Sequence, residues 1–595
     1  MTTVIGINWP PFHDVSCSVI VDGKLIFATE EERYTRKKHS PHQVPYYSLI
    51  SALEFLKDKY DILPGDIDAY ATTFNINQFP FHERLNISTF ERNLIIASTL
   101  NESIENRKAF VPSTKGYFFS GMNNIYSITK FLKFVYAKIG AEFNADIKVY
   151  PVMHHLAHAS SAYYFSGFKD AVLVVVDGQG ERLATTIWDV KNGEFNNILG
   201  VDLTGSLGYL YENVCKKLKF SRAEGPGKVM GLAPYGRYNK FIWTKFENVF
   251  SASTEKLPYH FNNKFVSRNP DKMYSNMAEY ITKGLNIEKE WDPLRIPLYN
   301  KAVDLAYALQ SVLEKKLIDV AAWAKDNTGR KNISLAGGVA LNSKANMAIY
   351  YSGFFKNMFV FPAPNDAGAT AGAAAYVYEK KFGKKMYRRE LKDIYLGKEY
   401  DHVDIENIVK KSKFKSEQIG TDMSRVAREI SRGSIIGIYT GRAEFGPRAL
   451  GNRSIVADPR KKINLKNLNI IKGREWWRPL APSILKSSMY KYLVDPIPNK
   501  FMTTMFKTSR EAEINVPAVC HVDKTTRPQI VEKRDSSIFY DLIKSFEEIT
   551  NVGAIINTSF NIRGEPIVET PYEALASFSN SGLDMLYLDG WLLKK

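Results

Sequence analysis

The chain has 595 residues, of which 45% are hydrophobic and 13% are aromatic. This length exceeds what one hydrophobic core supports, so the composition predicts two to four folded domains and excludes a disordered protein. The formal net charge of +17 is compatible with nucleic-acid binding. However, the lysines and arginines are spread along the chain, which is equally typical of a solvated surface with small phosphate ligands.

Cysteine spacing and apolar runs indicate the cellular compartment. Cys17, Cys215 and Cys520 lie far apart and form no CxxC pair, which favours a reducing interior over disulfides or a thiolate zinc site. Residues 4–7 have the pattern of a strand instead of a basic and apolar leader, and no apolar run is long enough to cross a bilayer. We therefore expect a soluble, cytoplasmic protein without a membrane partner.

The predicted strands of the first half occur twice in the same order. Each copy has a strand, a polar loop and a hairpin, which turns at Asp22-Gly23 in the first copy and at Asn192-Gly193 in the second. The strands are expected over 4–7, 18–21, 25–28, 171–176 and 184–188, with a last one toward 198. This repeat predicts a duplicated α/β domain whose two copies face each other across a cleft.

Two histidines and two carboxylates lie at the ends of these elements. His154 and His158 are four residues apart at a predicted helix start and share one face. Asp177 follows a strand, and Asp366 begins another predicted helix. Imidazole and carboxylate ligands favour iron, manganese or magnesium alongside zinc. If the fold brings the four together, they form a metal site; the alternatives are packing histidines and a helix N-cap at Asp366. His155 faces elsewhere on the helix and is left out.

A short strand over 332–335 leads into Gly337, Gly338 and Asn342 before a helical stretch. Without a Cβ, these glycines let backbone amides at a helix start approach a phosphate or a ribose.

The chain changes character after about residue 383. The basic stretch 384–389 and the polar residues to about 415 predict a linker or an exposed connector, after which a second domain begins. We place the domains at 1–395 and 396–595.

Three polar segments of this second domain predict an anionic substrate. They are the glycine-rich segment 439–454, the segment 472–479, and the turn after a strand over 554–556. Guanidinium groups bind phosphate in bidentate geometry, and glycines let the backbone approach it. Each segment alone could be a salt-bridged surface loop. The candidate side chains are Arg442, Arg448, Arg453, Lys472, Arg474, Arg478, Ser559 and Asn561.

Nine motifs in this order resemble the O-carbamoyltransferase family that modifies nodulation factors and antibiotics. They are HD, HHLAHA, VVVDGQGE, GPGKVMGLAPYG, LAGGVALN, NDAGATAGAA, GRAEFGPRALGNRS, IKGREWWRP and NTSFN. The resemblance covers essentially the whole chain. It implies an α/β fold with an N-terminal duplicated actin-like (ASKHA) domain, similar to tRNA threonylcarbamoyladenosine transferase, and a C-terminal YrdC-like α/β domain. The YrdC signature KxR with SxN matches Lys472, Arg474, Ser559 and Asn561.

The resemblance implies an ATP-dependent O-carbamoyltransferase. Carbamoyl phosphate and ATP, with Mg²⁺, would form carbamoyl adenylate in the C-terminal domain, and the carbamoyl group would pass to an acceptor hydroxyl in the N-terminal domain. The metal there would be held by His154, His158, Asp177 and Asp366, with iron favoured and manganese or zinc as alternatives.

The resemblance also implies roles for single residues. His13 would deprotonate the acceptor, although it could simply be a loop histidine bonded to Asp14. The adenylate would contact Lys228, Gly337, Gly338 and Asn342. The phosphates in the C-terminal domain would contact Arg442, Arg448, Arg453, Lys472, Arg474 and Arg527, and ATP would contact Ser559 and Asn561.

The acceptor is not determined by these motifs. The first loop, 8–14, is richer in proline and aromatic residues than the glycine-rich family version, and variable loops such as 75–125 are expected to supply acceptor contacts. A hydroxyl-bearing small molecule or glycan is the favoured acceptor, and carbamoylation of tRNA or another nucleic acid is an alternative. A small-molecule kinase of the actin superfamily is a second alternative. A homodimer is the default expectation.

Overall fold

The computed structural model describes residues 1–9, 11–41, 43–75, 125–144, 146–254, 256–267, 269–287, 291–293 and 300–595. Nearly all of the segment expected to contact the acceptor, 75–125, therefore lies outside the described residues.

Two five-stranded sheets of the same topology form the core of the first half. The first has the order β3-β2-β1-β4-β5 and the second β8-β7-β6-β11-β12. In the first sheet, the central strand β1 pairs antiparallel with β2 and parallel with β4. In the second sheet, the central strand β6 pairs in the same way with β7 and β11. The strands are β1 (Thr3–Ile7), β2 (Ser16–Val21), β3 (Lys24–Glu30), β4 (Ala69–Thr72), β5 (Lys148–Pro151), β6 (Asp170–Val176), β7 (Leu183–Lys191), β8 (Glu194–Asp202), β11 (Asn332–Ala336) and β12 (Asn357–Val360). The predicted duplication of an α/β domain is confirmed, because both sheets repeat one topology.

The two predicted hairpin turns have the same backbone conformation in both copies of the duplicated domain. Asp22 and Gly23 have φ of 45° and 75°, and Asn192 and Gly193 have φ of 55° and 90°. Both turns thus place two left-handed residues between antiparallel strands, a conformation that Asp-Gly and Asn-Gly accept readily.

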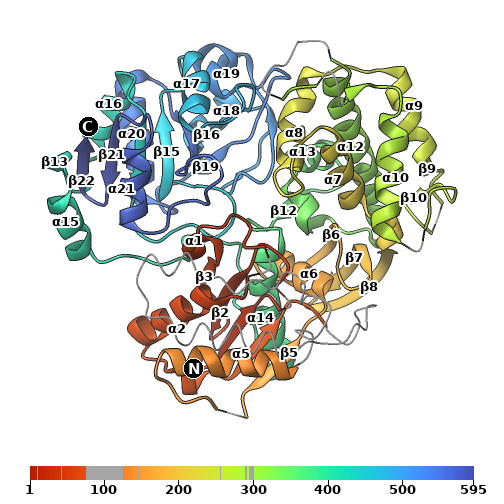
Figure 1. The fold of residues 1–595 in the computed structure, drawn as a ribbon, viewed down its shortest axis with the longest axis horizontal. Coiled ribbons are helices and arrows are strands. Elements are labelled where there is room, and N and C mark those ends of the chain that lie inside the picture. Colours follow the sequence, from red (N-terminus) through yellow and green to blue (C-terminus); the bar gives the residue numbers. More distant parts are fainter. Residues whose placement is uncertain are drawn as a thin grey trace.

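Helices alternate with the two sheets in layers (Figure 1). Helices α2 (Tyr46–Tyr60) and α5 (Ile125–Lys138) cover the first sheet, whereas α6 (His154–Tyr164) and α14 (Asp366–Phe382) pack in a core with residues of both sheets. The far side of the second sheet packs against α7 (Leu207–Lys217), α8 (Gly225–Leu232), α9 (Lys240–Val249), α10 (Pro270–Thr282) and α12 (Lys301–Thr328). Smaller elements are α1 (Glu32–Thr35), β9 (Phe250–Ser251), β10 (His260–Phe261) and α13 (Ser343–Tyr351).

The second domain is built on one mixed sheet of eight strands, in the order β13-β22-β21-β14-β15-β20-β16-β19. These strands are β13 (Lys415–Gln418), β14 (Ile436–Tyr439), β15 (Arg453–Ala457), β16 (Ala481–Leu485), β19 (Gln529–Val531), β20 (Ala554–Ser559), β21 (Met585–Leu588) and β22 (Trp591–Lys594). A separate pair is β17 (Phe506–Lys507) and β18 (Thr525–Thr526). The helices are α15 (His402–Lys411), α16 (Met423–Ser431), α17 (Ile463–Ile471), α18 (Met489–Tyr492), α19 (Arg510–Asn515), α20 (Ser537–Thr550) and α21 (Pro571–Ser579).

Helix α20 illustrates how this domain acquires its core. Its buried residues Phe539, Leu542, Ile543 and Phe546 follow the spacing of one helix face. They pack in one cluster with residues of the central strands, such as Ile555 of β20.

The segment between α14 and α15 differs from the expected exposed connector. Met386, Ile394 and Leu396 are buried, and the backbone N–H of Ala28 in β3 donates to the Leu396 carbonyl at 3.0 Å. The expectation of an exposed connector is wrong at these positions, because the apolar residues between the basic ones pack against the N-terminal domain.

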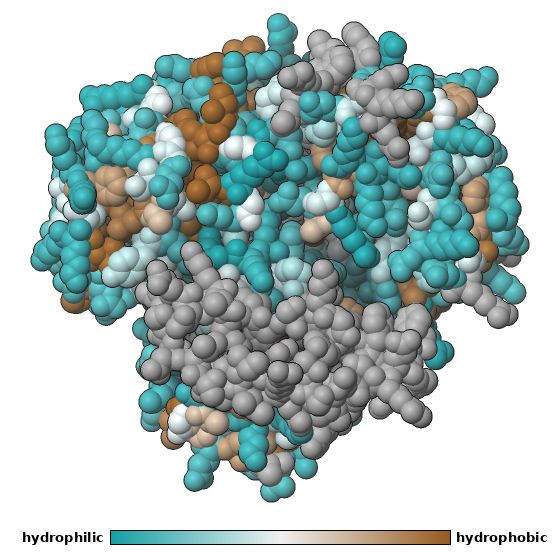
Figure 2. Space-filling model, viewed as in Figure 1, coloured by the Kyte–Doolittle hydropathy of each residue, from teal (hydrophilic) through white to brown (hydrophobic). Residues whose placement is uncertain are grey.

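Figure 2 shows a largely hydrophilic face, with hydrophobic residues gathered in patches over the C-terminal domain. Among the described residues, no helix combines the length and the apolar character needed to cross a membrane.

Candidate active site

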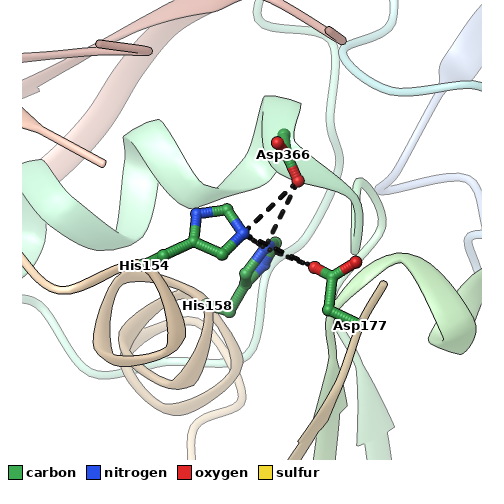
Figure 3. A group of neighbouring side chains, drawn as sticks. All are labelled: His154, His158, Asp177 and Asp366. Atoms are coloured by element: carbon green, nitrogen blue, oxygen red, sulfur yellow. Dashed lines mark hydrogen bonds and ion pairs between the residues drawn. The ribbon is translucent and has the colours of Figure 1, made fainter. Parts of the chain in front are cut away.

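Four buried side chains converge between the two halves of the N-terminal domain (Figure 3). His154, His158, Asp177 and Asp366 each offer one ligand atom, and these atoms lie within 4.8 Å of one another. His158 Nε2 lies 3.2 Å from Asp177 Oδ2 and 3.7 Å from Asp366 Oδ1. His154 Nε2 lies 3.5 Å from each carboxylate and 3.1 Å from His158 Nε2. Two imidazole nitrogens and two carboxylate oxygens form a donor set that fits a divalent metal.

Each of these ligands is fixed by the element that carries it. His154 is the first residue of α6, and His158 follows one turn later. Asp177 extends β6, and its backbone N–H donates to the Ala184 carbonyl at 2.8 Å. Asp366 is the first residue of α14, so it is not the N-cap, which is Asn365.

The carboxylates determine the charge of the site. Burial would lower the pKa of His158, but its contacts with Asp177 and Asp366 outweigh burial and raise that pKa to about 9. Burial acts in the opposite sense on Asp177, yet contact with the two histidines holds the Asp177 pKa well below its usual range. The site therefore favours a positive charge between these groups, whether protons or a metal ion.

His155 takes no part in this cluster. Its Nδ1 lies 3.0 Å from Thr186 Oγ1 of β7, and burial beside His154 lowers its pKa to about 3. The side chain is thus a neutral packing histidine, as expected from its place on the helix.

His13 lies in the loop after β1 and interacts with the carboxylates of the cluster. Its Nδ1 is 3.0 Å from Asp14 Oδ2, and Asp14 Oδ1 is 2.7 Å from His39 Nδ1. The His13 side chain is 57% exposed, and the negative charges of Asp366 and Asp14 raise its pKa to about 10. The expected hydrogen bond to Asp14 is present, and the negative charge of Asp366, one of the four converging side chains, also acts on the imidazole.

The glycine turn adjoins the same cluster. Gly337 has φ of 87° and packs against the backbone of Val176, while a Cβ on Gly338 would lie 3.1 Å from Asp177 Oδ1. Asn342 caps α13 by accepting from the Ala345 N–H, and its amide exchanges hydrogen bonds of 2.9 and 3.0 Å with Gln310. Its side chain therefore holds the turn in place.

Lys228 connects the two domains. Its Nζ lies 3.0 Å from Glu475 Oε1 in the C-terminal domain and 3.4 Å from Oε2 of Glu224, the N-cap of its own helix. Glu224 in turn pairs with Lys38 at 2.7 Å, so an alternating chain of charges runs across the domain boundary.

Five cations of the C-terminal domain lie near one another beside this chain. Removal from water lowers the pKa of every member, and neighbouring positive charges lower it further for all of them except Arg478. The lowering brings the pKa of Arg448 to about 10 and that of Arg474 to about 9. The members of this cation cluster are Arg448, Lys472, Arg474, Arg478 and Arg527. Lys472 is buried and the four arginines are half-buried, and such a concentration of like charge favours binding of a polyanion.

Lys472 also meets the predicted SxN residues. Its Nζ donates to the Asn561 Oδ1 at 2.8 Å and to the Asn561 carbonyl at 3.0 Å, and it bonds to the Ser559 carbonyl. Ser559 Oγ donates to Asn561 Oδ1 at 2.7 Å. The three residues thus form one hydrogen-bonded group, although 87 residues separate Lys472 from Ser559.

Two of the predicted phosphate ligands have other partners. Arg442 donates to the carbonyls of Ile26, Leu396 and Gly397, and thereby ties the C-terminal domain to β3 and the connector. Arg453 is fully buried, and its guanidinium donates to the Thr440 and Gly441 carbonyls. Both guanidinium groups serve the fold through backbone carbonyls.

Arg478 is a member of the cation cluster that was not assigned to the phosphate ligands. It lies in the motif IKGREWWRP and is a candidate for an anionic substrate from the sequence, but the family resemblance implies a phosphate contact only for Lys472 and Arg474 of this motif. The only sequence signal for Arg478 was its nearness to these two cations. The sequence did not indicate a role for Lys38 or Glu475, because the ion-pair partner of each lies in a distant segment of the chain.

Comparison with known proteins matches both domains. The family model described as Carbamoyltransferase N-terminus matches residues 3–375, and that described as Carbamoyltransferase C-terminus matches residues 427–595.

Individual relatives extend over most of the chain. The nodulation protein NolNO of Sinorhizobium fredii is 31% identical over 599 residues and covers 98% of this chain and 79% of its own. NolO of Bradyrhizobium diazoefficiens is 32% identical, with 74% and 78% covered. An uncharacterized protein of Synechocystis is 31% identical, with 100% and 97% covered. Among solved structures, full-length HypF in its phosphate- and nucleotide-bound form is 13% identical, with 64% and 56% covered and a TM-score of 0.32, a value too low to support an argument.

Proposed function

The chain belongs to the carbamoyltransferase family and is a transferase of carbamoyl groups, and on this premise we propose an ATP-dependent O-carbamoyltransferase that works in two steps. Residues 396–595 form carbamoyl adenylate from carbamoyl phosphate and ATP. Residues 1–395 transfer the carbamoyl group to an acceptor hydroxyl at the metal cluster. The favoured acceptor is a hydroxyl-bearing small molecule or glycan.

The observation that carries the first step is the cation cluster. Lys472 is buried and the four arginines are half-buried, and their positive charges repel one another, so bound phosphates stabilise the cluster by charge-assisted hydrogen bonds. The triphosphate of ATP with Mg²⁺, together with carbamoyl phosphate, supplies this negative charge. Ser559 and Asn561 both accept hydrogen bonds from Lys472, a member of this cluster, and offer polar groups to the nucleotide.

The first step consists of two displacements at phosphorus. Water attacks the phosphorus of carbamoyl phosphate, the bond from that phosphorus to the carbamoyl oxygen breaks, and inorganic phosphate is released with carbamate. An oxygen of the carbamate then attacks the α-phosphorus of ATP. The bond from the α-phosphorus to the bridging oxygen breaks, and pyrophosphate leaves with its electron pair. Arginines of the cation cluster stabilise the charge that develops on the leaving phosphates.

In the second step the acceptor oxygen attacks the carbamoyl carbon and AMP leaves. Gly337 and Gly338 present backbone beside Asp177 to the adenylate, and Lys228 contacts its phosphate. The metal, iron by preference with manganese or zinc as alternatives, would be held by His154, His158, Asp177 and Asp366 and would supply Lewis-acid polarisation of the carbamoyl or phosphate oxygens.

His13 is the proposed base that takes the acceptor proton. A base must be neutral, whereas Asp366 and Asp14 raise the pKa of His13 to about 10. With a cation held by the four ligands, the charge of Asp366 would be offset and the pKa of His13 would lie closer to neutrality. The proton-accepting nitrogen is then Nε2, since Nδ1 lies against Asp14.

The experiment that tests the first step measures pyrophosphate release from ATP with and without carbamoyl phosphate, in the absence of acceptor. Release that requires carbamoyl phosphate is the expected result. No release with added Mg²⁺, Mn²⁺ or Fe²⁺ would contradict the adenylate route. Salt-sensitive binding of polynucleotide would favour a nucleic-acid acceptor over a small molecule. Both matching family models describe carbamoyltransferases, which favours carbamoyl transfer over the kinase alternative.

A further inference from the structure

One buried carboxylate lies beside the metal cluster without being a ligand. Glu181 is in the loop between β6 and β7, four residues after Asp177, and is 6% exposed. Its Oε1 accepts two backbone hydrogen bonds, from the N–H of His154 at 2.9 Å and from the N–H of Asn75 at 2.8 Å. A single oxygen thus joins three segments that are distant in the sequence.

The first of these segments is the start of α6. Helix N-termini expose backbone N–H groups without partners in the helix, and Met153, the N-cap, offers no side-chain acceptor. Glu181 supplies that acceptor at the first helical residue, and its negative charge also suits the positive end of the helix dipole. His154 is this first residue and His158 lies one turn further. The hydrogen bond to Glu181 therefore holds in place the start of the helix that carries both histidines.

The second segment, 73–75, holds the ring of His154. The Thr73 carbonyl lies 3.2 Å from Nδ1, and the Phe74 ring stacks on the imidazole at a centroid distance of 4.1 Å and an interplanar angle of 12°. A hydrogen bond from Nδ1 to Thr73 leaves Nε2 unprotonated and directed toward the cluster. The bond from Asn75 to Glu181 therefore anchors the segment that sets the tautomer and the plane of this ligand.

The third segment is the loop of Glu181 itself, which also begins with the ligand Asp177. The N–H of Gly180 donates to the Leu183 carbonyl at 2.7 Å, and a Cβ on Gly180 would lie 2.6 Å from Cδ2 of His155. A Cβ on Gly178 would lie 3.2 Å from the Tyr209 ring. The loop is thus held tightly between α6 and α7, which gives Glu181 one position.

We propose that Glu181 is a positioning residue of the metal site: its Oε1 holds the start of the histidine helix and the segment against His154 in one arrangement with Asp177. This inference rests on the metal site of the proposed function. It concerns geometry that exists before any substrate binds, so it can be tested without carbamoyl transfer.

The test is the affinity of the substrate-free protein for Co²⁺, measured by competition with a chromophoric chelator. E181A removes the shared acceptor, and E181D retains the charge but withdraws the oxygen by one methylene. Both should bind Co²⁺ about 10- to 100-fold more weakly, the usual effect of losing a partner behind the metal ligands. E181Q retains an oxygen at Oε1 and should restore binding to within about threefold of the unmodified protein.

The matched control is Glu31, a second buried carboxylate that accepts backbone N–H groups at a helix start. It bonds to the N–H of Tyr47 at 3.0 Å and to that of Ser48 at 2.8 Å in α2, which carries no proposed ligand. E31A should lower the thermal stability as E181A does and leave the Co²⁺ affinity unchanged.

Unchanged Co²⁺ affinity in folded E181A or E181D would overturn the proposal and leave the carbamoyl-transfer mechanism intact. If E181A does not fold, E181D and E181Q decide the question. Failure of the unmodified protein to bind Co²⁺ would instead contradict the metal site itself, and with it this role of Glu181.

Discussion

Gly372 of α14 lies directly against the carbonyl oxygen of Ala157 in α6, so that a Cβ at position 372 would collide with that oxygen. These two helices carry His154, His158 and Asp366, three of the four proposed ligands. The glycine therefore determines how closely the ligands from opposite halves of the domain can approach.

We predict that G372A weakens metal binding by at least about tenfold. The collision involves backbone, which cannot move aside like a side chain, and overpacking of this kind costs about 1–3 kcal/mol of unfolding free energy. Thermal unfolding and Co²⁺ affinity measure the two effects. G65A is the control, since a Cβ on Gly65 would meet no atom within 4 Å. Unchanged metal affinity in G372A would show that the site tolerates a shift of α14.

Substitutions in the two domains should separate the two half-reactions. H154A should abolish carbamoyl transfer and retain carbamoyl-phosphate-dependent pyrophosphate release, because it removes a metal ligand only. K472A should lower pyrophosphate release by about 100-fold or more, since it removes a buried cation and its bonds to Ser559 and Asn561. Supplying carbamoyl adenylate directly should restore transfer in K472A. Equal loss of both half-reactions in H154A would contradict separate sites.

Arg527 is expected to lower the stability of the ligand-free protein and to strengthen ATP binding. Burial and the charges of Arg448, Arg474 and Arg478 hold its pKa well below the usual range, so the ligand-free protein carries unfavourable charge there. We expect R527M to raise the free energy of unfolding by about 1 kcal/mol without ATP, and to weaken ATP binding by about tenfold or more. Thermal unfolding with and without ATP measures both. R534M is the control, because Arg534 is 65% exposed. A destabilised R527M without ATP would count against a strained cluster.

Glu569 should make stability depend on pH. Its side chain is fully buried, and burial outweighs the attraction of Arg453 and Arg33 to raise its pKa to about 7 from an ordinary value near 4.5. Between these values the folded state binds more protons than the unfolded state, so this group lowers stability as pH rises from about 4.5 to 7.

The corresponding variant is E569Q, a neutral analogue of the protonated acid. It should match the unmodified protein near pH 4.5 and exceed its unfolding free energy by about 1–3 kcal/mol above pH 7. Denaturant unfolding at several pH values measures the difference. A constant difference across that range would show that Glu569 does not titrate between the two values.

Much of the site chemistry was predictable from short-range patterns. Asp-Gly and Asn-Gly specify two-residue hairpin turns by their tolerance of positive φ, and their recurrence at 22–23 and 192–193 indicated the duplication. The i,i+4 spacing places His154 and His158 on one helix face whatever the rest of the chain does. The structure confirms that Asp177 and Asp366 meet these histidines.

The residues whose partners are distant were not predictable in the same way. Arg442, Arg448 and Arg453 share one glycine-rich segment, yet Arg448 lies in the cation cluster whereas the other two donate to backbone carbonyls. The residue type predicts that a guanidinium group binds an oxygen acceptor. It does not predict whether that acceptor is a phosphate or a backbone carbonyl. The connector was likewise predicted to be exposed, because its lysines and arginines are more prominent in the sequence than the apolar residues between them.

The sequence by itself thus determined the chemical groups, the duplicated α/β order and the family resemblance, because residue type and local spacing suffice for these. Only the tertiary structure decided which cations gather near Lys472 and which support the fold, because packing between distant segments sets their partners. It also decided that Glu181 lies behind the metal ligands. One carboxylate oxygen can accept from His154 and Asn75 only after α6, the 73–75 segment and the β6–β7 loop have met.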